Sequence, residues 1–535
     1  MKKRVLLIIP ALLGLMSCNT PSQEIPLEIS KTTDNYRTYY QIFPYAFADS
    51  NGDGIGDIRG IIDKLDYIEN LCFDGLWLTP VHRSETYHKY DVDDYKSIDP
   101  KFGTLADYDE LVSKCHEKGM TILLDLVFNH TSDDHIWFQK CLAAHFGGKR
   151  DDPYYNYYNV VKLGNDDSIP VGYSRYQNSN YAYESRFYSG MPDINLQDVL
   201  DNPDGNLAKD LKSIVEFWIK DHNVDGFRLD AVTSYFTGDA NKNTDFLTIL
   251  NKWVKDLKPN AYIVGEGTWG NVGENQRYQD SGVDSFFNFE DAQTGGKISS
   301  AIIKGRANYL YRTCFENLDT ATDKGMPAPF IANHDTGRMY GACYGRGSVD
   351  NLKFGYSFLQ MLNGSTFTYY GDEAGMTVKI GTGNNAKDED KRQPMPWNDK
   401  YQCKPVSGST KATDEEKYPL GNVDSQLKDK NSLVNYVAKV NRLRRAFPAI
   451  ARGTPKEIYL NDSKDLAVVE KTYKDEQIFI VMNASSVGTR KFDCSSLGEV
   501  ELKGKVSPSG SVKLNGKNLE LSPQSIAILK LKGEN

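Results

Sequence analysis

The stretch GFRLDAVTS, residues 226–234, places two charged side chains inside a pattern that otherwise predicts a buried β-strand. Side chains alternate between the two faces of an extended chain, so Arg228 and Asp230 share one face, opposite the apolar residues. A buried carboxylate is costly unless a partner compensates it, and a nearby cation lowers its pKa. Taken alone, this pair is also consistent with a purely structural salt bridge.

The composition is typical of a soluble globular protein. The chain has 535 residues, enough for two to four domains, with 39% hydrophobic and 25% charged residues. Its net charge of -9 argues against a nucleic-acid partner, because there is no basic excess to neutralise phosphates. A neutral substrate suits this balance. The 33 tyrosines supply flat apolar faces that also carry hydroxyl groups, as a sugar-binding cleft requires.

The first 18 residues, MKKRVLLIIPALLGLMSC, have the basic start, apolar run and small residue of a secretion signal. The ending LMSC resembles a bacterial lipobox, which would make Cys18 the lipidated first residue of the mature protein. Residues 19–33 then form a polar tether. We therefore expect an exported outer-membrane lipoprotein of a Gram-negative bacterium that contacts the membrane only through its lipid anchor. A simple cleaved signal peptide is the alternative.

Eight cysteines are scattered along the chain without CxxC or Cys/His metal spacing. Removing Cys18 leaves seven, so at least one thiol is free. We expect most of them to pack as small hydrophobic residues.

Apolar runs rich in Val, Ile, Tyr and Phe alternate with stretches of helical spacing, which predicts strand-helix units around a parallel sheet. The predicted strands are residues 39–47, 75–81, 120–130, 226–232, 261–267, 283–289, 329–335 and 366–373, and two of the helices between them are 102–119 and 206–223. Eight such strands can close a (β/α)8 TIM barrel, a fold of the α/β class. We assign the barrel to residues 34–130 and 206–445.

Two further regions stand outside this pattern. Residues 131–205 are long, weakly periodic and rich in Tyr, Asn, Asp and Gly, so they predict a subdomain inserted after the third strand. Residues 446–535 carry short alternating strands separated by turn residues, which predicts an all-β C-terminal sandwich domain.

Polar residues gather at the carboxyl ends of four predicted strands. They are Asp125, Asn129 and His130; Arg228 and Asp230; Glu266; and Asn333, His334 and Asp335. In a parallel barrel these ends form one rim, so residues far apart in sequence converge there. Independent structural salt bridges at four strand ends would be an improbable coincidence, and we expect a functional site.

Five motifs occur in a fixed order: DLVFNH (125–130), MPDIN (191–195), GFRLDAV (226–232), GEG (265–267) and FIANHD (330–335). Together they resemble the motif set of the α-amylase superfamily of retaining glycoside hydrolases, over nearly the whole mature chain. The resemblance implies a (β/α)8 barrel, a domain inserted after the third strand and a β-sandwich at the end.

The resemblance makes Asp230 the nucleophile, Glu266 the general acid/base and Asp335 the carboxylate that orients the substrate and stabilises the transition state. Retention at a glycosidic bond requires one ionised carboxylate and one protonated carboxyl group about 5–5.5 Å apart. Arg228 favours the charged form of Asp230, and the apolar residues before Glu266 favour a raised pKa. The alternative for Glu266 is a polar group at a strand end with a purely structural role.

The resemblance also implies substrate-binding residues. His130 and His334 are similar to the two histidines that bind the glucose before the cleaved bond, and Tyr90 is similar to the stacking platform beneath it. Arg228 belongs to the same set. A lone histidine is more often structural, but these two histidines lie inside the motifs. The chain departs from the family at Lys89, where many members carry glycine, and at Thr233 and Ser234, which replace a Lys-His pair of many α-amylases.

The segment DSNGDGIGD, residues 49–57, predicts a calcium site. Oxygen ligands stand at alternate positions of a Gly-rich turn: Asp49, Asn51, Asp53, the carbonyl of Ile55, and Asp57. The segment resembles the structural calcium loop of oligo-1,6-glucosidase relatives and some amylases. A turn closed without metal is the alternative.

We expect a monomeric, endo-acting α-amylase that cleaves α-1,4 bonds of starch-like α-glucans, including maltooligosaccharides. Ala231 follows the nucleophile where α-1,6-specific relatives tend to carry Val, and MPDIN differs from their QPDLN. An oligo-α-1,6-glucosidase or neopullulanase-like enzyme is the alternative that the calcium loop favours. A non-catalytic glucan-binding protein is the alternative from a different class, which the presence of all three acids disfavours.

Overall fold

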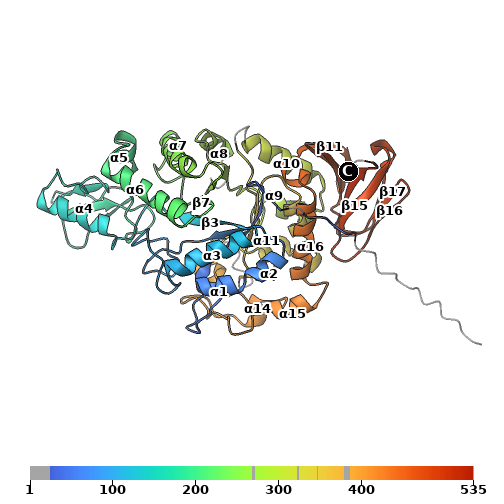
Figure 1. Ribbon diagram of the computed structural model, residues 1–535, viewed down its shortest axis with the longest axis horizontal. Helices are drawn as coiled ribbons and strands as arrows, with labels where there is room; N and C mark the ends of the chain where they lie inside the picture. The colour runs from blue at the N-terminus through green and yellow to red at the C-terminus, as the bar shows by residue number, and fades with distance from the viewer. Residues whose placement is uncertain are drawn as a thin grey trace, which may run out of the picture.

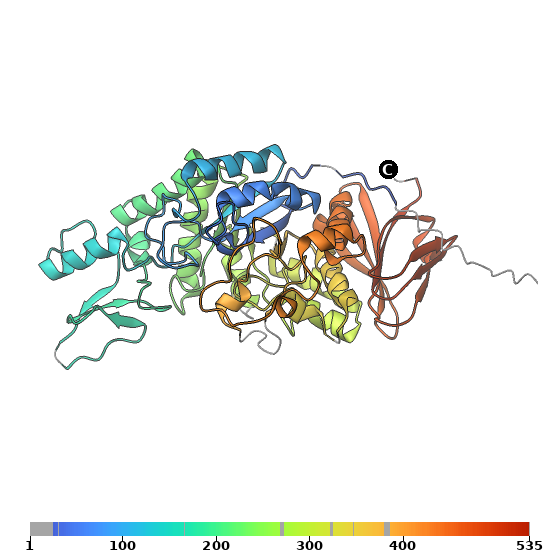
Figure 2. The same ribbon diagram turned by 90° about the horizontal axis from the view of Figure 1, so that it is seen from below.

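A parallel β-sheet forms the centre of the molecule (Figures 1 and 2). The computed structural model describes residues 25–29, 31–164, 166–267, 272–321, 325–345, 347–378 and 386–533. The sheet has seven strands in the order β10-β1-β2-β3-β7-β8-β9. Their bounds are β1 (Thr38–Ile42), β2 (Gly75–Leu78), β3 (Thr121–Leu126), β7 (Gly226–Leu229), β8 (Tyr262–Gly265), β9 (Ser285–Phe286) and β10 (Thr366–Tyr369).

The remaining position of the barrel differs from the prediction of a strand at 329–335. Here the chain makes two isolated parallel bridges, Phe287 with Ala328 and Phe330 with Phe367, which link β9 to β10. Pro327 and Pro329 flank Ala328, and proline has no N–H to donate to a ladder, so a continuous strand cannot form. The bridges nevertheless complete the (β/α)8 barrel.

The inside of the barrel is filled by side chains, most of them aromatic. The ring of Tyr39 stacks on Phe367 at 4.8 Å and on Tyr262 at 5.5 Å, and Trp77 stacks on Phe287 at 5.2 Å. These residues form one buried cluster with Leu123, Val264, Phe289, Ala292, Ala328 and Phe330. The interior is therefore a packed apolar core that leaves no pore for water.

Helices cover the outside of the sheet (Figure 1). They are α1 (Ile58–Asp63), α2 (Leu65–Asn70), α3 (Leu105–Glu117), α6 (Asn206–Glu216), α7 (Ala240–Leu257), α8 (Val272–Gln279), α9 (Lys297–Lys304), α10 (Asn308–Ala321), α11 (Met339–Cys343), α12 (Val349–Gln360) and α16 (Leu433–Ala446). Shorter helices are α13 (Asp388–Lys391), α14 (Asp414–Lys417), α15 (Val423–Lys428), α17 (Ala449–Arg452) and the 3-10 turns η1 (Pro44–Ala46) and η4 (Cys494–Leu497).

Local sequence fixes where these helices begin and end. The predicted helix 102–119 begins at a capping box in which Thr104 and Asp107 satisfy each other's backbone N–H groups. The predicted helix 206–223 is α6, which continues as a π-helical turn, η2 (Phe217–Asp221).

Residues 131–205 form a separate lobe that projects from the barrel between β3 and β7 (Figure 2). It contains α4 (Ile136–Gly147), a three-stranded antiparallel sheet of β4 (Val160–Lys162), β6 (Tyr181–Glu184) and β5 (Tyr173–Arg175), and α5 (Leu196–Asp201). An antiparallel bridge between His130 and Asp193 fastens the base of the lobe to the segment that follows β3. The lobe thus begins at the rim where the polar residues gather.

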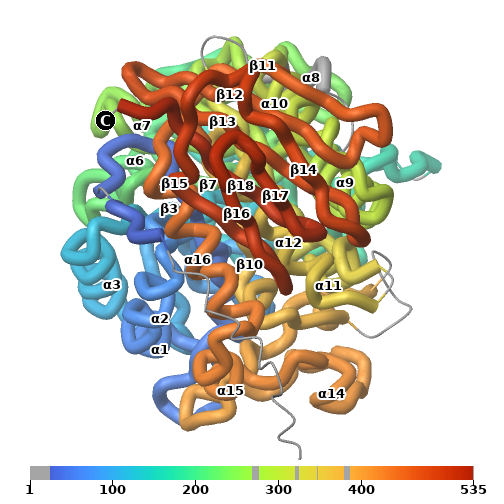
Figure 3. Tube along the Cα trace, turned by 90° about the vertical axis from the view of Figure 1, so that its right-hand side faces the viewer, coloured from blue at the N-terminus to red at the C-terminus, as the bar shows by residue number. Residues whose placement is uncertain are grey.

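The C-terminal region is all β and packs against the barrel (Figure 3). Its strands are β11 (Thr454–Leu460), β12 (Leu466–Tyr473), β13 (Glu476–Asn483), β14 (Arg490–Asp493), β15 (Val500–Val506), β16 (Val512–Asn515), β17 (Asn518–Leu521) and β18 (Ser525–Leu531). They form a five-stranded and a three-stranded antiparallel sheet. Val468 faces the core between the sheets, whereas its neighbour Val469 belongs to the core shared with the barrel.

The N-terminal signal, Cys18 and the first part of the expected tether lie outside the described residues. Thr32, near the tether's end, donates a hydrogen bond to Asp74. Among the described residues, the seven cysteines from Cys72 to Cys494 are all buried with free thiols. None of the helices described is both long and apolar enough to cross a membrane.

Candidate active site

The alternation of side chains along the barrel strands brings the polar residues together at one end. Asp125 in β3 lies two residues after the interior Leu123, and it is the register partner of Arg228 in β7. Glu266 stands in the same relation to the interior Val264, immediately after β8. Each acid thus points inward, just above the aromatic core.

Arg228 is the hub of this arrangement. Its side chain is 1% exposed and its guanidinium lies 5.4 Å from the centroid of the Trp77 ring. Nη1 donates to Asp125 at 2.9 Å and to Asp230 at 2.6 Å, and Nη2 donates to Glu266 at 2.9 Å. One planar cation therefore holds three carboxylates side by side, which a simple structural pair between Arg228 and Asp230 would not require.

Glu266 has the pKa of an acid that still holds its proton near neutrality. Burial raises its pKa to about 7, with a further contribution from the charges of Asp230 and Asp335, while Arg228 opposes the shift. Its Oε2 accepts from Arg228 and, at 2.9 Å, from the backbone N–H of Ala231. Because both bonds fall on Oε2, Oε1 is the oxygen that can carry a proton.

Asp230 differs from Glu266 in its electrostatic surroundings. Burial raises its pKa above the ordinary value, but the Coulomb attraction and the 2.6 Å hydrogen bond of Arg228 both oppose that rise. Arg228 binds Oδ1, which leaves Oδ2 as the oxygen able to attack another atom. The two neighbouring acids thus have the unequal surroundings that separate a proton donor from an ionised group.

Asp335 joins the group from the segment that follows the Ala328–Phe330 bridges. Burial works to raise its pKa, but His334, Arg392 and Arg228 together hold the pKa of this carboxyl below its usual value. Nη2 of Arg392 lies 2.9 Å from Oδ1, and Nε2 of His334 lies 3.1 Å from Oδ2. The charge of Asp335 in turn contributes to the raised pKa of Glu266.

His334 belongs to a continuous chain of hydrogen bonds. Burial lowers its pKa to about 3, so the imidazole is neutral at pH 7. The amide nitrogen of Gln41 donates to Nδ1 at 2.8 Å, so the ring proton sits on Nε2, 2.6 Å from the hydroxyl oxygen of Tyr90. Tyr90 then donates to Asp125 at 3.1 Å. Its ring lies parallel to His334, with centroids 5.4 Å apart.

His130 is placed differently from the other predicted site residues. It is buried, its pKa is lowered to about 4 by burial, and its ring packs against Phe187 from the inserted lobe. Within the described residues, its Nε2 has no hydrogen-bond partner. Within the same residues, no hydrogen bond or ion pair joins it to Asp230, Glu266 or Asp335, so its Nε2 is a buried polar atom without a protein partner.

Lys89 shows how the chain accommodates its departure from glycine. Its φ of 65° lies in the left-handed region that glycine adopts most easily. The side chain is buried, and Nζ donates to Asp99 at 2.6 Å and to the carbonyl of Ser84 at 2.7 Å. This buried ion pair anchors the loop that carries Tyr90.

Sequence reasoning missed three contributors to the site. Asp125 is a strand-end acid that it noted without a role, although strand alternation places it beside Arg228. Gln41 lies two residues after the interior Tyr39, so alternation could have identified it as well. Arg392 comes from the irregular segment after β10, where no periodic pattern indicates an inward direction.

The loop 49–57 closes on its own hydrogen bonds. The buried carboxylate of Asp49 accepts from the backbone N–H groups of Gly52 and Gly54 at 2.6 Å, and Asp57 accepts from that of Ser50 at 2.8 Å. Asn51 and Asp53 are exposed. Within the described ranges, no group of three or more His, Cys, Asp or Glu side chains could hold a metal ion. Calcium at this loop therefore stays a prediction from the sequence pattern.

A comparison with protein families gives the decisive match: the model for the α-amylase catalytic domain matches residues 41–453. The chain belongs to the α-amylase family. It is 34% identical to "Alpha-amylase 3" of Dictyoglomus thermophilum, covering 84% of this chain and 85% of that protein. It is 29% identical to an oligo-1,6-glucosidase of Parageobacillus thermoglucosidasius, covering 83% and 89%.

Among solved structures, Eubacterium rectale Amy13B superimposes with a TM-score of 0.84 at 33% identity, covering 95% of this chain and 97% of that one. The protein is therefore a glycoside hydrolase of the α-amylase family with a (β/α)8 barrel.

Replacing Arg228 with lysine tests whether the active site requires the planar guanidinium group of Arg228. Arg228→Lys keeps the charge but cannot bond three carboxylates in one plane, so we expect kcat/KM to fall by about a hundredfold or more and the Tm to fall. The matched control is Arg59→Lys, because Arg59 also binds two acids, Asp107 and Glu110, but at the surface. Equal, small losses in both variants would contradict the role of Arg228.

Proposed function

We propose that this enzyme is an exported, endo-acting α-glucan hydrolase that cleaves α-1,4-glucosidic bonds with retention of configuration. The observation that carries the proposal is the pairing of Asp230 with Glu266 through Arg228, because two adjacent acids in unequal electrostatic surroundings suit a retaining mechanism. Lipid attachment at Cys18 and a monomeric state belong to the same proposal and rest on sequence.

In the first step, Oδ2 of Asp230 attacks the anomeric carbon as the glycosidic C–O bond breaks. Glu266 gives its proton to the departing oxygen, and a covalent glycosyl-enzyme ester forms. In the second step, the Glu266 carboxylate removes a proton from water, and the resulting nucleophile displaces Asp230. The sugar leaves with its original configuration, and both acids return to their starting protonation states.

Further residues are assigned to substrate binding and transition-state stabilisation. Asp335 carries a negative charge that suits the positive charge developing on the sugar ring. The resemblance assigns His130 and His334, both neutral imidazoles, to the sugar hydroxyls; within the described residues Nε2 of His130 has no partner, whereas His334 would have to share its bonds to Gln41 and Tyr90. The ring of Tyr90, held parallel to His334, supplies an apolar face for a sugar.

An oligo-α-1,6-glucosidase is the second candidate, because several relatives at 26% to 29% identity carry that name. Ala231 and the MPDIN motif favour the α-1,4 linkage. Incubating the enzyme with amylose, pullulan and isomaltose separates the two. We expect amylose to be shortened to a mixture of oligosaccharides while isomaltose stays intact; rapid release of glucose from isomaltose, with slow attack on amylose, would reverse the assignment.

The role of Glu266 predicts a specific pH dependence. Because the protonated form donates, and its pKa is raised to about 7, kcat/KM should fall as the pH rises through about 7. Glu266→Gln cannot exchange a proton and should reduce turnover of amylose about several hundredfold, with the alkaline limb lost. The control is Glu110→Gln, an acid on the outer helix α3. Near-normal turnover by a folded Glu266→Gln variant would exclude the assignment.

We also propose, on the sequence pattern, that the loop 49–57 binds a structural calcium ion through Asp49, Asn51, Asp53, Asp57 and the carbonyl of Ile55. A bound ion stabilises only the folded state, so a chelator should lower the Tm, and added calcium should restore it. Elemental analysis of the purified protein gives an independent measurement. An unchanged Tm together with no bound metal would leave the hydrogen-bonded turn as the explanation of the motif.

A further inference from the structure

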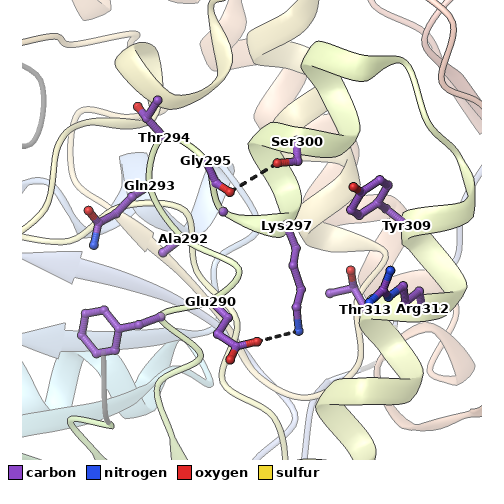
Figure 4. Close-up of a pocket in the computed structure, with 12 residues that line it drawn as sticks. Glu290, Ala292, Gln293, Thr294, Gly295, Lys297, Ser300, Tyr309, Arg312 and Thr313 are labelled. Carbon is purple, nitrogen blue, oxygen red and sulfur yellow. Dashed lines mark hydrogen bonds and ion pairs between the residues drawn. The ribbon is translucent and has the colours of Figure 1, made fainter. Parts of the chain in front are cut away.

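A pocket lies between the segment that follows β9 and the helices α9 and α10 (Figure 4). Its volume is about 510 Å³, within the roughly 300–1,000 Å³ typical of small-molecule sites. It is lined by the loop of residues 289–296 and by side chains of α9 and α10, including Lys297, Ser300, Tyr309 and Arg312.

Two short contacts join the pocket lining to the segment that leads to His334 and Asp335. The backbone N–H of Gln293 donates to the carbonyl of Ile331 at 2.9 Å, and the ring of Phe289 packs against Phe330 at 5.0 Å. Ile331 lies only three residues before His334 in the sequence. The pocket and the candidate active site are therefore carried by adjoining parts of the same rim.

The charged side chains that line the pocket are paired with groups of opposite charge. Lys297 pairs with Glu290 at 3.0 Å and with Glu316 at 2.8 Å, and Arg312 pairs with Glu316 at 2.6 Å. Figure 4 shows Lys297 and Glu290 facing one another at one side of the pocket. Each charged side chain of the lining thus already has a partner of opposite charge, and the buried Asp291 also acts on Lys297, so a neutral ligand suits the pocket.

The remaining lining suits a sugar. Tyr309, partly exposed at the start of α10, supplies an aromatic ring and a hydroxyl group. Gln293 has a left-handed φ of 65° in the Gln-Thr-Gly-Gly turn. Within the described residues, the side chains of Gln293 and Thr294 make no hydrogen bond, so their polar groups can pair with hydroxyls.

We propose that this pocket is an auxiliary binding site for the same α-glucan, which holds a chain outside the catalytic cleft. The inference rests on the proposed α-glucan substrate. Tyr309 supplies the stacking surface, and Gln293 with Thr294 supplies hydrogen bonds. A polymer held here and cleaved at the neighbouring site gains affinity from two points of attachment, whereas a short oligosaccharide reaches only one at a time.

Tyr309→Ala and Gln293→Ala test the pocket, and Tyr311→Ala is the matched control because Tyr311 lies on the same helix outside the pocket lining. Retardation in gels containing amylopectin, measured in a Glu266→Gln background that leaves the polymer intact, reports binding without hydrolysis. We expect Tyr309→Ala to weaken binding about threefold to tenfold, as loss of one stacking contact does, and Tyr311→Ala to leave it unchanged.

In the active enzyme, the same two pocket variants should raise KM for amylopectin while turnover of maltotriose stays within about twofold of the parent. Gln293→Ala provides a second result if Tyr309→Ala does not fold. Unchanged retardation by both folded pocket variants would overturn the auxiliary site while leaving the catalytic proposal intact. An enzyme that hydrolyses no α-glucan, yet is retarded through Tyr309, would instead refute the proposed function and retain the pocket.

Discussion

The structure depends on one buried cation. Arg228 binds Asp125, Asp230 and Glu266 at 2.6–2.9 Å inside a barrel end that excludes most water. Without the guanidinium, the carboxylates would repel one another in a medium of low dielectric, and an unpaired buried charge costs about 3–5 kcal/mol. With it, burial and the guanidinium act in opposite directions: burial raises the pKa values of Asp230 and Glu266, and Arg228 lowers both. The backbone N–H of Ala231 also lowers the pKa of Glu266, so burial is what keeps that pKa raised.

The aromatic core below the site makes this possible. Trp77, Tyr39 and Phe367 fill the barrel, so the acids lie directly above apolar side chains. Burial is accordingly the largest contribution to the raised pKa of Glu266. Trp77 also donates its indole N–H to Asp125 at 3.2 Å and lies under Arg228. The same packing that stabilises the barrel therefore tunes the proton affinity of the candidate acid.

The sequence predicted the site residues whose direction follows from strand alternation. It did not predict those that come from irregular segments of the chain. The inward direction of Arg228, Asp230 and Glu266 follows from a period of two. Arg392 reaches Asp335 from a coil, and no local pattern could indicate that direction. In place of the strand predicted at 329–335 there are two isolated bridges, because Pro327 and Pro329 have no backbone N–H to donate. The short strands β14, β16 and β17 each have four residues, too few for alternation to place them one by one within the predicted all-β domain.

Linkage specificity must be decided outside the group of acids. The bond-breaking atoms face the same anomeric carbon whether the leaving oxygen is O4 or O6 of the next sugar, so Asp230 and Glu266 cannot distinguish the two. The next sugar must instead contact residues beyond that carbon. Phe187 is 54% exposed on the inserted lobe and packs against His130, and Thr233 and Ser234 follow Asp230 closely in the sequence. Variation at such positions can change the linkage while the barrel, Arg228 and its three acids stay the same.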